Sequence, residues 1–207
     1  MTTQIFHSDK IKEGLGEKTY DLLTSKPRIC AKWVNSTISL SQAANAVSKN
    51  NPLLGAAGKI CDGVNYFFAS KSLFSSVQNF PTAVRKATNL RQIGQSALGI
   101  LKIVKDLLKC LTSYAGFQAK RLGFGLDAVC TLGTAADSLL NLKERVQSPS
   151  ISNPLTKKLQ IIGNSLDVVS GGLFLGYTLR GRSMHPIVGP LLGAMGLSNA
   201  IALHYLS

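Results

Sequence analysis

The chain has 207 residues, of which 45% are hydrophobic and only 16% are charged. Its 23 basic and 10 acidic residues give a net charge of +13, but the basic residues stand singly or in pairs at the edges of apolar segments. A nucleic-acid-binding domain ordinarily clusters its basic residues, so this pattern argues against nucleic acid as the partner and favours an anionic membrane surface.

The first half of the chain predicts three helices, which are separated by breaks that contain proline. Ser25-Lys26-Pro27 and Asn50-Asn51-Pro52 separate them. We expect Asn79-Phe80-Pro81 to end the third helix, because proline lacks a backbone donor and crowds the preceding turn. The predicted helices run from Lys10 to Thr24, from Ile29 to Ser48 and from Leu54 to Val77.

The window from Leu98 to Leu111 is the clearest amphipathic helix in the sequence. Its leucines, isoleucine and valine recur on one face, and its lysines fall on the opposite face. Such a helix can lie on a membrane, or it can bury its apolar face in an ordinary bundle. The predicted lipid-binding residues are Lys102, Lys105, Lys109, Leu101, Val104 and Leu108.

A long fifth helix is predicted from Tyr114 to Val146. It carries Asp127 and Asp137, for which we favour interior polar contacts over surface charges, and both over a functional pair. Residues 149–158 contain serine and proline and are predicted to be a linker. The linker would join a helical region with amphipathic helices, residues 1–148, to a C-terminal apolar region, residues 159–207.

The C-terminal region is the most informative part of the sequence. The 21 residues from Ile187 to Ser207 contain no Lys, Arg, Asp or Glu, and Val168–Leu179 is a second uncharged run. A membrane-spanning helix needs about 20 apolar residues, so we predict a helical hairpin that spans the bilayer or dips into one leaflet. Asp167 opposes insertion, at a cost of about 2.5–3.5 kcal/mol. A hairpin buried in a soluble core is the alternative. The predicted hairpin residues are Leu173, Leu175, Gly189, Gly193 and Leu197.

The sequence offers no constellation for catalysis, cofactor binding or metal binding. The four cysteines are far apart, and the three histidines have no carboxylate or cysteine at ligand spacing. Neither a Gly-x-Ser-x-Gly elbow nor a P-loop occurs. We therefore predict no catalytic residues, no metal, no cofactor and no enzymatic activity.

Two segments resemble a known family. The first is the run from Trp33 to Phe74. The second is the end of the chain, with K-K-L-Q-I-I-G-N-S-L-D and I-V-G-P-L-L-G-A-M-G-L-S-N-A-I-A-L-H-Y. They are similar to the middle and the C-terminus of peroxin eleven, a family of membrane proteins that elongate peroxisomes. The chain departs from the family at Ala69-Ser70, where an aspartate is usual. The resemblance implies that an amphipathic helix, here Leu98–Leu111, inserts into the cytosolic leaflet and curves it. The matching C-terminal positions are Asp167, Gly189, Gly193 and Leu197.

The same composition also resembles the inclusion-membrane proteins secreted by chlamydiae, which pair two closely spaced apolar segments. Their hydrophobic hairpin would correspond to Val168–Leu179 and Ile187–Leu206. This resemblance implies the membrane of a pathogen vacuole, whereas the first implies an organelle membrane similar to that of the peroxisome.

These observations predict an all-α, multi-helix, membrane-associated bundle with a basic amphipathic helix and a C-terminal apolar hairpin. The predicted function is non-enzymatic binding and remodelling of an organelle or vacuole membrane. The predicted partners are an anionic lipid bilayer and further copies of the chain. The alternative is a secreted inclusion-membrane protein, or a soluble helical adaptor or effector that acts through protein–protein contacts.

Overall fold

The computed structural model describes residues 14, 16–45, 48, 50–115, 120–147 and 153–206, and within them it contains helices and no strand. Residues 16–25 are helical, and six long helices follow. The predicted all-α class is confirmed. The six helices are α2 (Pro27–Ala43), α3 (Pro52–Lys86), α4 (Leu90–Ala115), α5 (Lys120–Gln147), α6 (Pro154–Leu179) and α7 (Val188–Leu206).

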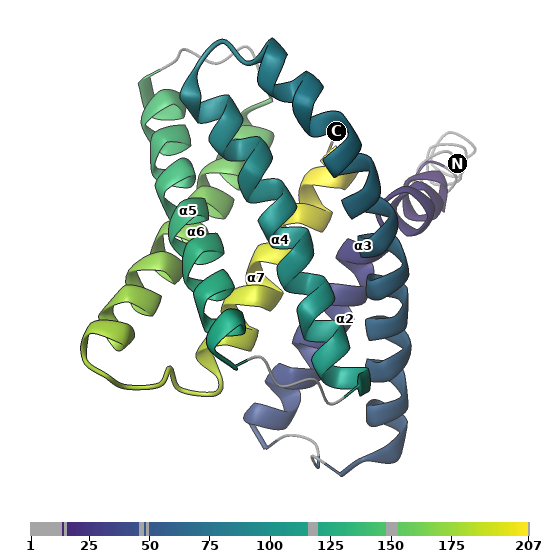
Figure 1. Ribbon diagram of the computed structural model, residues 1–207. Coiled ribbons are helices and arrows are strands. Elements are labelled where there is room, and N and C mark those ends of the chain that lie inside the picture. The colour runs from purple at the N-terminus through teal and green to yellow at the C-terminus, as the bar shows by residue number, and fades with distance from the viewer. Residues whose placement is uncertain are drawn as a thin grey trace, which may run out of the picture.

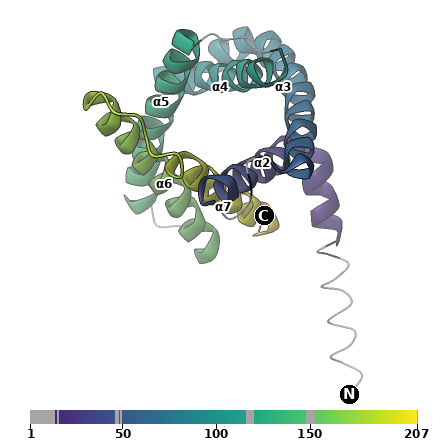
Figure 2. The same cartoon turned by 90° about the horizontal axis from the view of Figure 1, so that it is seen from below.

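The six helices form a closed ring. Each one packs against the helix that precedes it and the helix that follows it, and α7 returns to pack against α2. Seen from below, the ring surrounds an opening, with α3, α4 and α5 along one side and α2, α7 and α6 along the other (Figure 2). No helix of the six packs across the middle of the ring.

The short helix at residues 16–25 lies against the far end of α7. The Lys18 ammonium donates to the carbonyl of Tyr205 at 2.8 Å, and the hydroxyls of Thr19 and Tyr205 are 2.8 Å apart. Lys26, just after this helix, places its Nζ 3.1 Å from Nδ1 of His204, whose side chain is buried. These contacts fasten the N-terminal side of the chain to α7, next to the seam that closes the ring.

Asparagine and proline set the start of several helices. Pro52 and Pro154 occupy the first turns of α3 and α6, where a missing N–H costs nothing. The side chain of Asn51 accepts hydrogen bonds from the N–H groups of Leu53 and Leu54, and that of Asn153 accepts from Leu155. Because α6 begins at Pro154, the predicted linker at 149–158 extends too far; residues 148–152 lie outside the described part of the chain.

Three predicted helix boundaries are wrong, and the first is the end of the second helix, because α2 ends at Ala43 and Ser48 is not helical. Helix α3 continues through Pro81 to Lys86 instead of ending at Asn79-Phe80-Pro81. Pro81 is exposed on the helix, as is Val77 one turn earlier, so the carbonyl that loses its donor can face the surroundings instead of the ring. Tyr114 ends α4 rather than beginning the fifth helix, which starts at Lys120.

Small residues let neighbouring helices approach closely. A Cβ added to Gly171 would lie 2.4 Å from the Cβ of Ala135 on α5, and one added to Gly163 would lie 2.6 Å from Nδ2 of Asn199 on α7. A Cβ on Gly193 would lie 3.1 Å from Oγ of Ser36 on α2. None of the largest side chains in the described residues is fully buried. The contacts between neighbouring helices, which we call seams, therefore hold the ring together, and a central apolar core does not.

Adjacent glycines on α6 allow a matched test of the α5–α6 seam. Gly172→Ala, which meets nothing within 4 Å, should raise the free energy of unfolding by up to about 1 kcal/mol through helix propensity. Gly171→Ala should instead lower it by about 1–3 kcal/mol, because the new methyl group collides with Ala135. Denaturant unfolding of both variants in neutral detergent measures this difference. Equal stability of the two variants would contradict the proposed seam.

Candidate functional site

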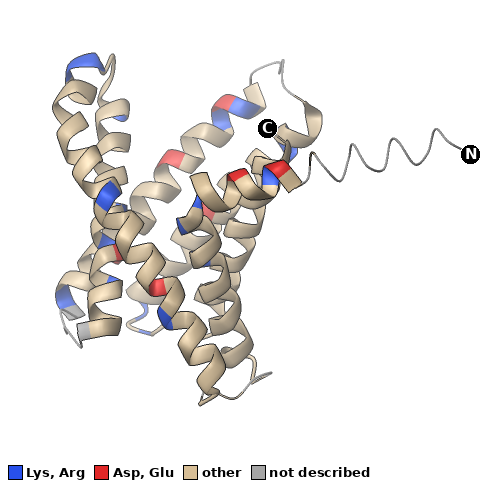
Figure 3. Ribbon diagram, turned by 90° about the vertical axis from the view of Figure 1, so that its right-hand side faces the viewer, with Lys and Arg blue, Asp and Glu red and all other residues tan. Residues whose placement is uncertain are grey.

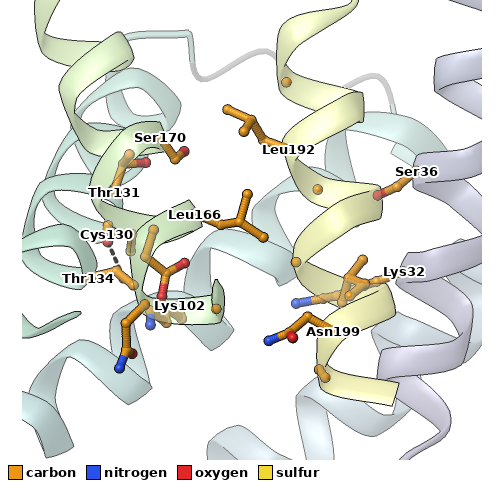
Figure 4. Close-up of a pocket in the computed structure, with 18 of the residues that line it drawn as sticks. Lys32, Ser36, Lys102, Cys130, Thr131, Thr134, Leu166, Ser170, Leu192 and Asn199 are labelled. Carbon is orange, nitrogen blue, oxygen red and sulfur yellow. Dashed lines mark hydrogen bonds between the residues drawn. The ribbon is translucent and has the colours of Figure 1, made fainter. Parts of the chain in front are cut away.

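The ring surrounds a partly open cavity of about 960 Å³, which is lined by many polar and charged side chains and by apolar ones. Side chains from α2, α4, α5, α6 and α7 line it, and the close-up shows hydroxyl, amide and ammonium groups on several of these helices (Figure 4). The charged lining residues are Lys32, Lys102, Lys105, Lys109, Arg145, Asp106 and Asp167.

The polar face of α4 forms one wall of this cavity. Lys102, Lys105 and Lys109 line it, since a spacing of three and four residues places them on one helix face. The apolar residues predicted to accompany them in lipid, Leu101, Val104 and Leu108, are half-buried. The structure therefore places the three lysines inside the ring, where they face the cavity and not an external membrane surface.

Leucines on one flank of α4 contact α5. A Cβ built on Gly133 would lie 3.0 Å from a methyl group of Leu98, and one built on Gly123 would lie 4.0 Å from Leu108. This flank of the amphipathic helix is thus used for packing between neighbours, which is the ordinary-bundle alternative that the sequence left open.

Asp106 joins α4 to α2. Its Oδ2 accepts a hydrogen bond from the Arg28 guanidinium at 2.8 Å and another from the Lys32 ammonium. The Asp106 side chain is only 12% exposed, so these two cations compensate a carboxylate that is nearly removed from solvent. Sequence analysis did not single out Asp106 as a site; the available signal was that it is the one acid among the lysines of the Leu98–Leu111 window.

A second polar layer joins α2, α3 and α4 around Asp62. Its carboxylate accepts from the Asn35 amide of α2 at 2.7 Å and from the Ser113 hydroxyl of α4 at 2.9 Å. Between the two layers, the buried Asn65 of α3 accepts from Arg28 at 3.4 Å and donates to Sγ of Cys110 at 3.6 Å. Three consecutive helices are therefore connected by side chains that satisfy one another.

Asp127 and Asp137 both make contacts between helices, but their side chains are 39% and 26% exposed, which places them between the favoured interpretation, interior polar contacts, and the second, surface charges. Asp127 forms an ion pair with Lys105 of α4 at 2.8 Å. Asp137 accepts from Arg91 at 2.9 Å and from Gln95 at 2.8 Å. Burial opposes ionisation of Asp137, but the hydrogen bonds from Arg91 and Gln95 outweigh it, and the pKa of the carboxyl is lowered.

Lys109 is in an unusual electrostatic position. Its side chain is open to the cavity, yet protein surrounds it on most sides, and this partial removal from water lowers the pKa of the ammonium. The positive charge of Lys105 lowers the pKa further, while Asp127 and Asp106 act in the opposite direction. The cavity wall therefore holds a cation whose charge is not fully compensated.

The predicted hairpin exists as α6 and α7, but its two helices differ. Among the described helices, α6 is the one long and apolar enough to cross a membrane, and α7 does not reach that level. Leu173 and Leu175 on α6 are exposed, whereas Gly189, Gly193 and Leu197 on α7 line the cavity.

Asp167, the acid that opposed insertion of α6, lies on the cavity wall. The hydroxyl of Ser138 on α5 donates to its Oδ2 at 2.9 Å. Asp167 is compatible with an apolar helix because its carboxylate faces the cavity and accepts a hydrogen bond there.

The described residues include no group of three His, Cys, Asp or Glu placed to hold a metal ion. The four cysteines are all free thiols, and burial raises the pKa of the buried pair, Cys110 and Cys130. Higher pKa values disfavour the thiolate form that would be needed for nucleophilic or metal-binding chemistry.

Comparisons with protein-family models, with curated proteins and with solved structures give no match for this chain. The interpretation of the cavity and of the outer surface consequently rests on the geometry itself.

The Asp106 contact yields a stability prediction. Asp106→Asn leaves Arg28 and Lys32 facing each other without a carboxylate, and we expect the free energy of unfolding to fall by on the order of 3 kcal/mol. Glu144→Gln is the control, because Glu144 pairs with Arg91 but is 62% exposed, and exposed pairs contribute less than about 1 kcal/mol. Denaturant unfolding should show a larger loss of stability for Asp106→Asn than for Glu144→Gln. Similar losses in the two variants would contradict the role assigned to Asp106.

The surroundings of Lys109 yield a titration prediction. Lys105→Gln removes a like charge and releases Asp127 from its ion pair, so the pKa of Lys109 should rise. Because only the neutral amine reacts, reductive methylation of Lys109, followed by mass spectrometry, should then require a higher pH. Lys71→Gln, an exposed change on α3 outside the cavity, should leave the profile unchanged. An unchanged profile in Lys105→Gln would rule out this coupling.

Proposed function

We propose that this chain is a non-enzymatic, membrane-associated protein whose outer surface contacts lipid. The observation that carries the proposal is a stripe of exposed apolar side chains along α3. Leu53, Ile60, Phe67 and Phe74 recur every seven residues, which is two helical turns, and each is at least 64% exposed. A soluble protein rarely leaves so continuous an apolar surface in water.

Similar stripes continue around the ring. On α6, Leu155, Ile162 and Val169 follow the same seven-residue spacing and are 48–50% exposed. On α5, the exposed apolar residues recur at helical spacing along most of the helix. None of the residues in these stripes lines the cavity. The α5 stripe consists of Leu122, Val129, Leu132, Leu139 and Val146.

The ring therefore places many charged and polar side chains around its cavity, among apolar ones, and leaves on its exterior the apolar stripes that a soluble helical bundle would bury. Charged residues are sparse along its ribbons, which are tan over most of their length (Figure 3). Removing one large apolar side chain from water contributes about 1.5–3 kcal/mol. Transfer of the stripes into lipid is correspondingly favourable, and α6 is the helix that we propose enters the hydrocarbon region.

Electrostatic attraction to anionic lipid would come from basic residues outside the cavity. Arg85 and Lys86 at the end of α3, and Arg180 and Arg182 in the turn after α6, are exposed. Each basic residue near an anionic surface contributes about 1 kcal/mol. In this proposal they take the role that the sequence had given to Lys102, Lys105 and Lys109.

Unequal helix lengths around the ring support a part in membrane remodelling. Helices α2 and α7 have 17 and 19 residues, whereas α3 has 35. At 1.5 Å per residue, α6 with its 26 residues is roughly 39 Å long, longer than a hydrocarbon core of about 30 Å, so it would tilt or thicken the bilayer around it. The resemblance to peroxin eleven points the same way, towards elongation of an organelle membrane, and the resemblance to inclusion-membrane proteins towards a vacuole.

Vesicle flotation tests the outer surface. The wild-type chain should float with liposomes, more completely when they contain anionic lipid. Ile60→Glu combined with Phe67→Glu places two acids in the α3 stripe and should lower the bound fraction at least about tenfold, because a charge in the apolar region costs several kcal/mol.

The control for this experiment adds the same charge elsewhere. Thr112→Glu combined with Gln147→Glu changes exposed positions near the ends of α4 and α5, away from the α3 stripe and from the exposed arginines, and should bind nearly as well as wild type. A wild-type chain that stays monodisperse without detergent and binds no vesicles would overturn the proposal. It would favour the adaptor alternative, in which a protein covers the stripes.

A further inference from the structure

The cavity carries an excess of positive charge that its own acids do not neutralise. Five basic side chains line it against two acidic ones. Asp106 is already engaged by Arg28 and Lys32, and Asp127, outside the lining, pairs with Lys105. Among the described residues, Lys102 and Lys109 therefore have no carboxylate partner.

Two facing walls of the cavity carry groups suited to an oxyanion. Lys102 and Lys109 lie two turns apart on one face of α4, with Lys105 between them. Figure 4 shows Lys102 and Thr134 on one side of the cavity, and Lys32 and Asn199 on the other. Oδ1 of Asn199 is buried and has no hydrogen-bond partner in the described structure. A buried acceptor normally has a donor, so this atom marks an unfilled position.

We propose that the cavity binds a phosphate-bearing ligand, held through its oxygens by Lys102 and Lys109 and through an O–H by Asn199. Phosphate has enough acceptor oxygens for several ammonium groups, and in its hydrogen phosphate form it also carries the donor that Asn199 requires. Sulfate has the same shape and the acceptors but no O–H at neutral pH. The cavity volume of about 960 Å³ lies within the range of small-molecule sites, which leaves room for an organic part of the ligand.

The electrostatics of Lys109 agree with an anionic occupant. Partial removal from water and the neighbouring Lys105 both disfavour its charge, and a bound anion between the lysines would relieve both. The site uses residues that face the interior, whereas the proposed membrane contact uses residues that face outward. The two proposals can therefore fail separately.

Calorimetric titration of the full chain in neutral detergent tests the inference. Inorganic phosphate and short-chain phosphatidic acid, below its micellar concentration, are titrated in separate arms at low ionic strength. Heat with phosphate alone supports a soluble ligand, and heat with the lipid alone supports a headgroup. Sulfate should bind more weakly than phosphate. Absence of binding in both arms would overturn the proposal, and equal affinity for sulfate would overturn the role of Asn199.

Matched charge-neutralising variants locate the site. Lys102→Gln combined with Lys109→Gln removes two charge-assisted contacts and should lower the affinity about 100-fold, at about tenfold each. Lys71→Gln combined with Lys158→Gln removes the same charge from exposed positions outside the cavity and should change affinity less than about twofold. Equal losses of affinity in the two double variants would show that net charge determines binding, and would overturn the proposed site. Vesicle flotation of the cavity variant should remain at the wild-type level, and a wild-type denaturant unfolding transition shows that the variant is folded.

Discussion

Asp106 of α4 accepts hydrogen bonds from Arg28 and Lys32 of α2, which links two helices that do not otherwise pack together, and the hollow ring depends on polar contacts of this kind. A ring with an open centre has little apolar interior to bury, and its buried hydrophobic residues are mostly small. Directional polar contacts at Asp106, Asp62, Asp127 and Asp137 must then fix how neighbouring helices lie. Leaving a buried carboxylate without one of its partners costs free energy. Arrangements of the helices that break these contacts are therefore disfavoured.

The inward direction of the polar residues explains both the cavity and the outer surface. A helix that turns its lysines and asparagines towards the centre must turn its leucines and phenylalanines away from it. The polar cavity and the apolar exterior are thus two consequences of one arrangement, with the glycines at the seams allowing the helices to come close enough to complete it. Asp167 illustrates this: an acid on the helix that is long and apolar enough to cross a membrane has a partner because that face looks inward.

Much of the secondary structure could be predicted because it is local. Asn-Pro pairs mark the starts of α3 and α6 through a side-chain cap and a preset backbone angle, both of which involve adjacent residues. Pro81 misled the prediction, since whether a proline breaks a helix depends on what surrounds the freed carbonyl. Acids in an otherwise apolar helix require partners, so contacts for Asp127 and Asp137 could be expected, but neither their partners on α4 nor their partial exposure could be read from the sequence.

The sequence by itself determined the all-helical class, the apolar and basic faces of α4, and the apolar character of α6, because these follow from residue spacing along one helix. The tertiary structure alone decided which way each face points. Lys102, Lys105 and Lys109 form a face in any helix, but whether that face meets a lipid headgroup or an enclosed cavity depends on where α2, α5, α6 and α7 stand around it. Periodicity fixes directions relative to the helix axis, whereas inside and outside are properties of the closed ring.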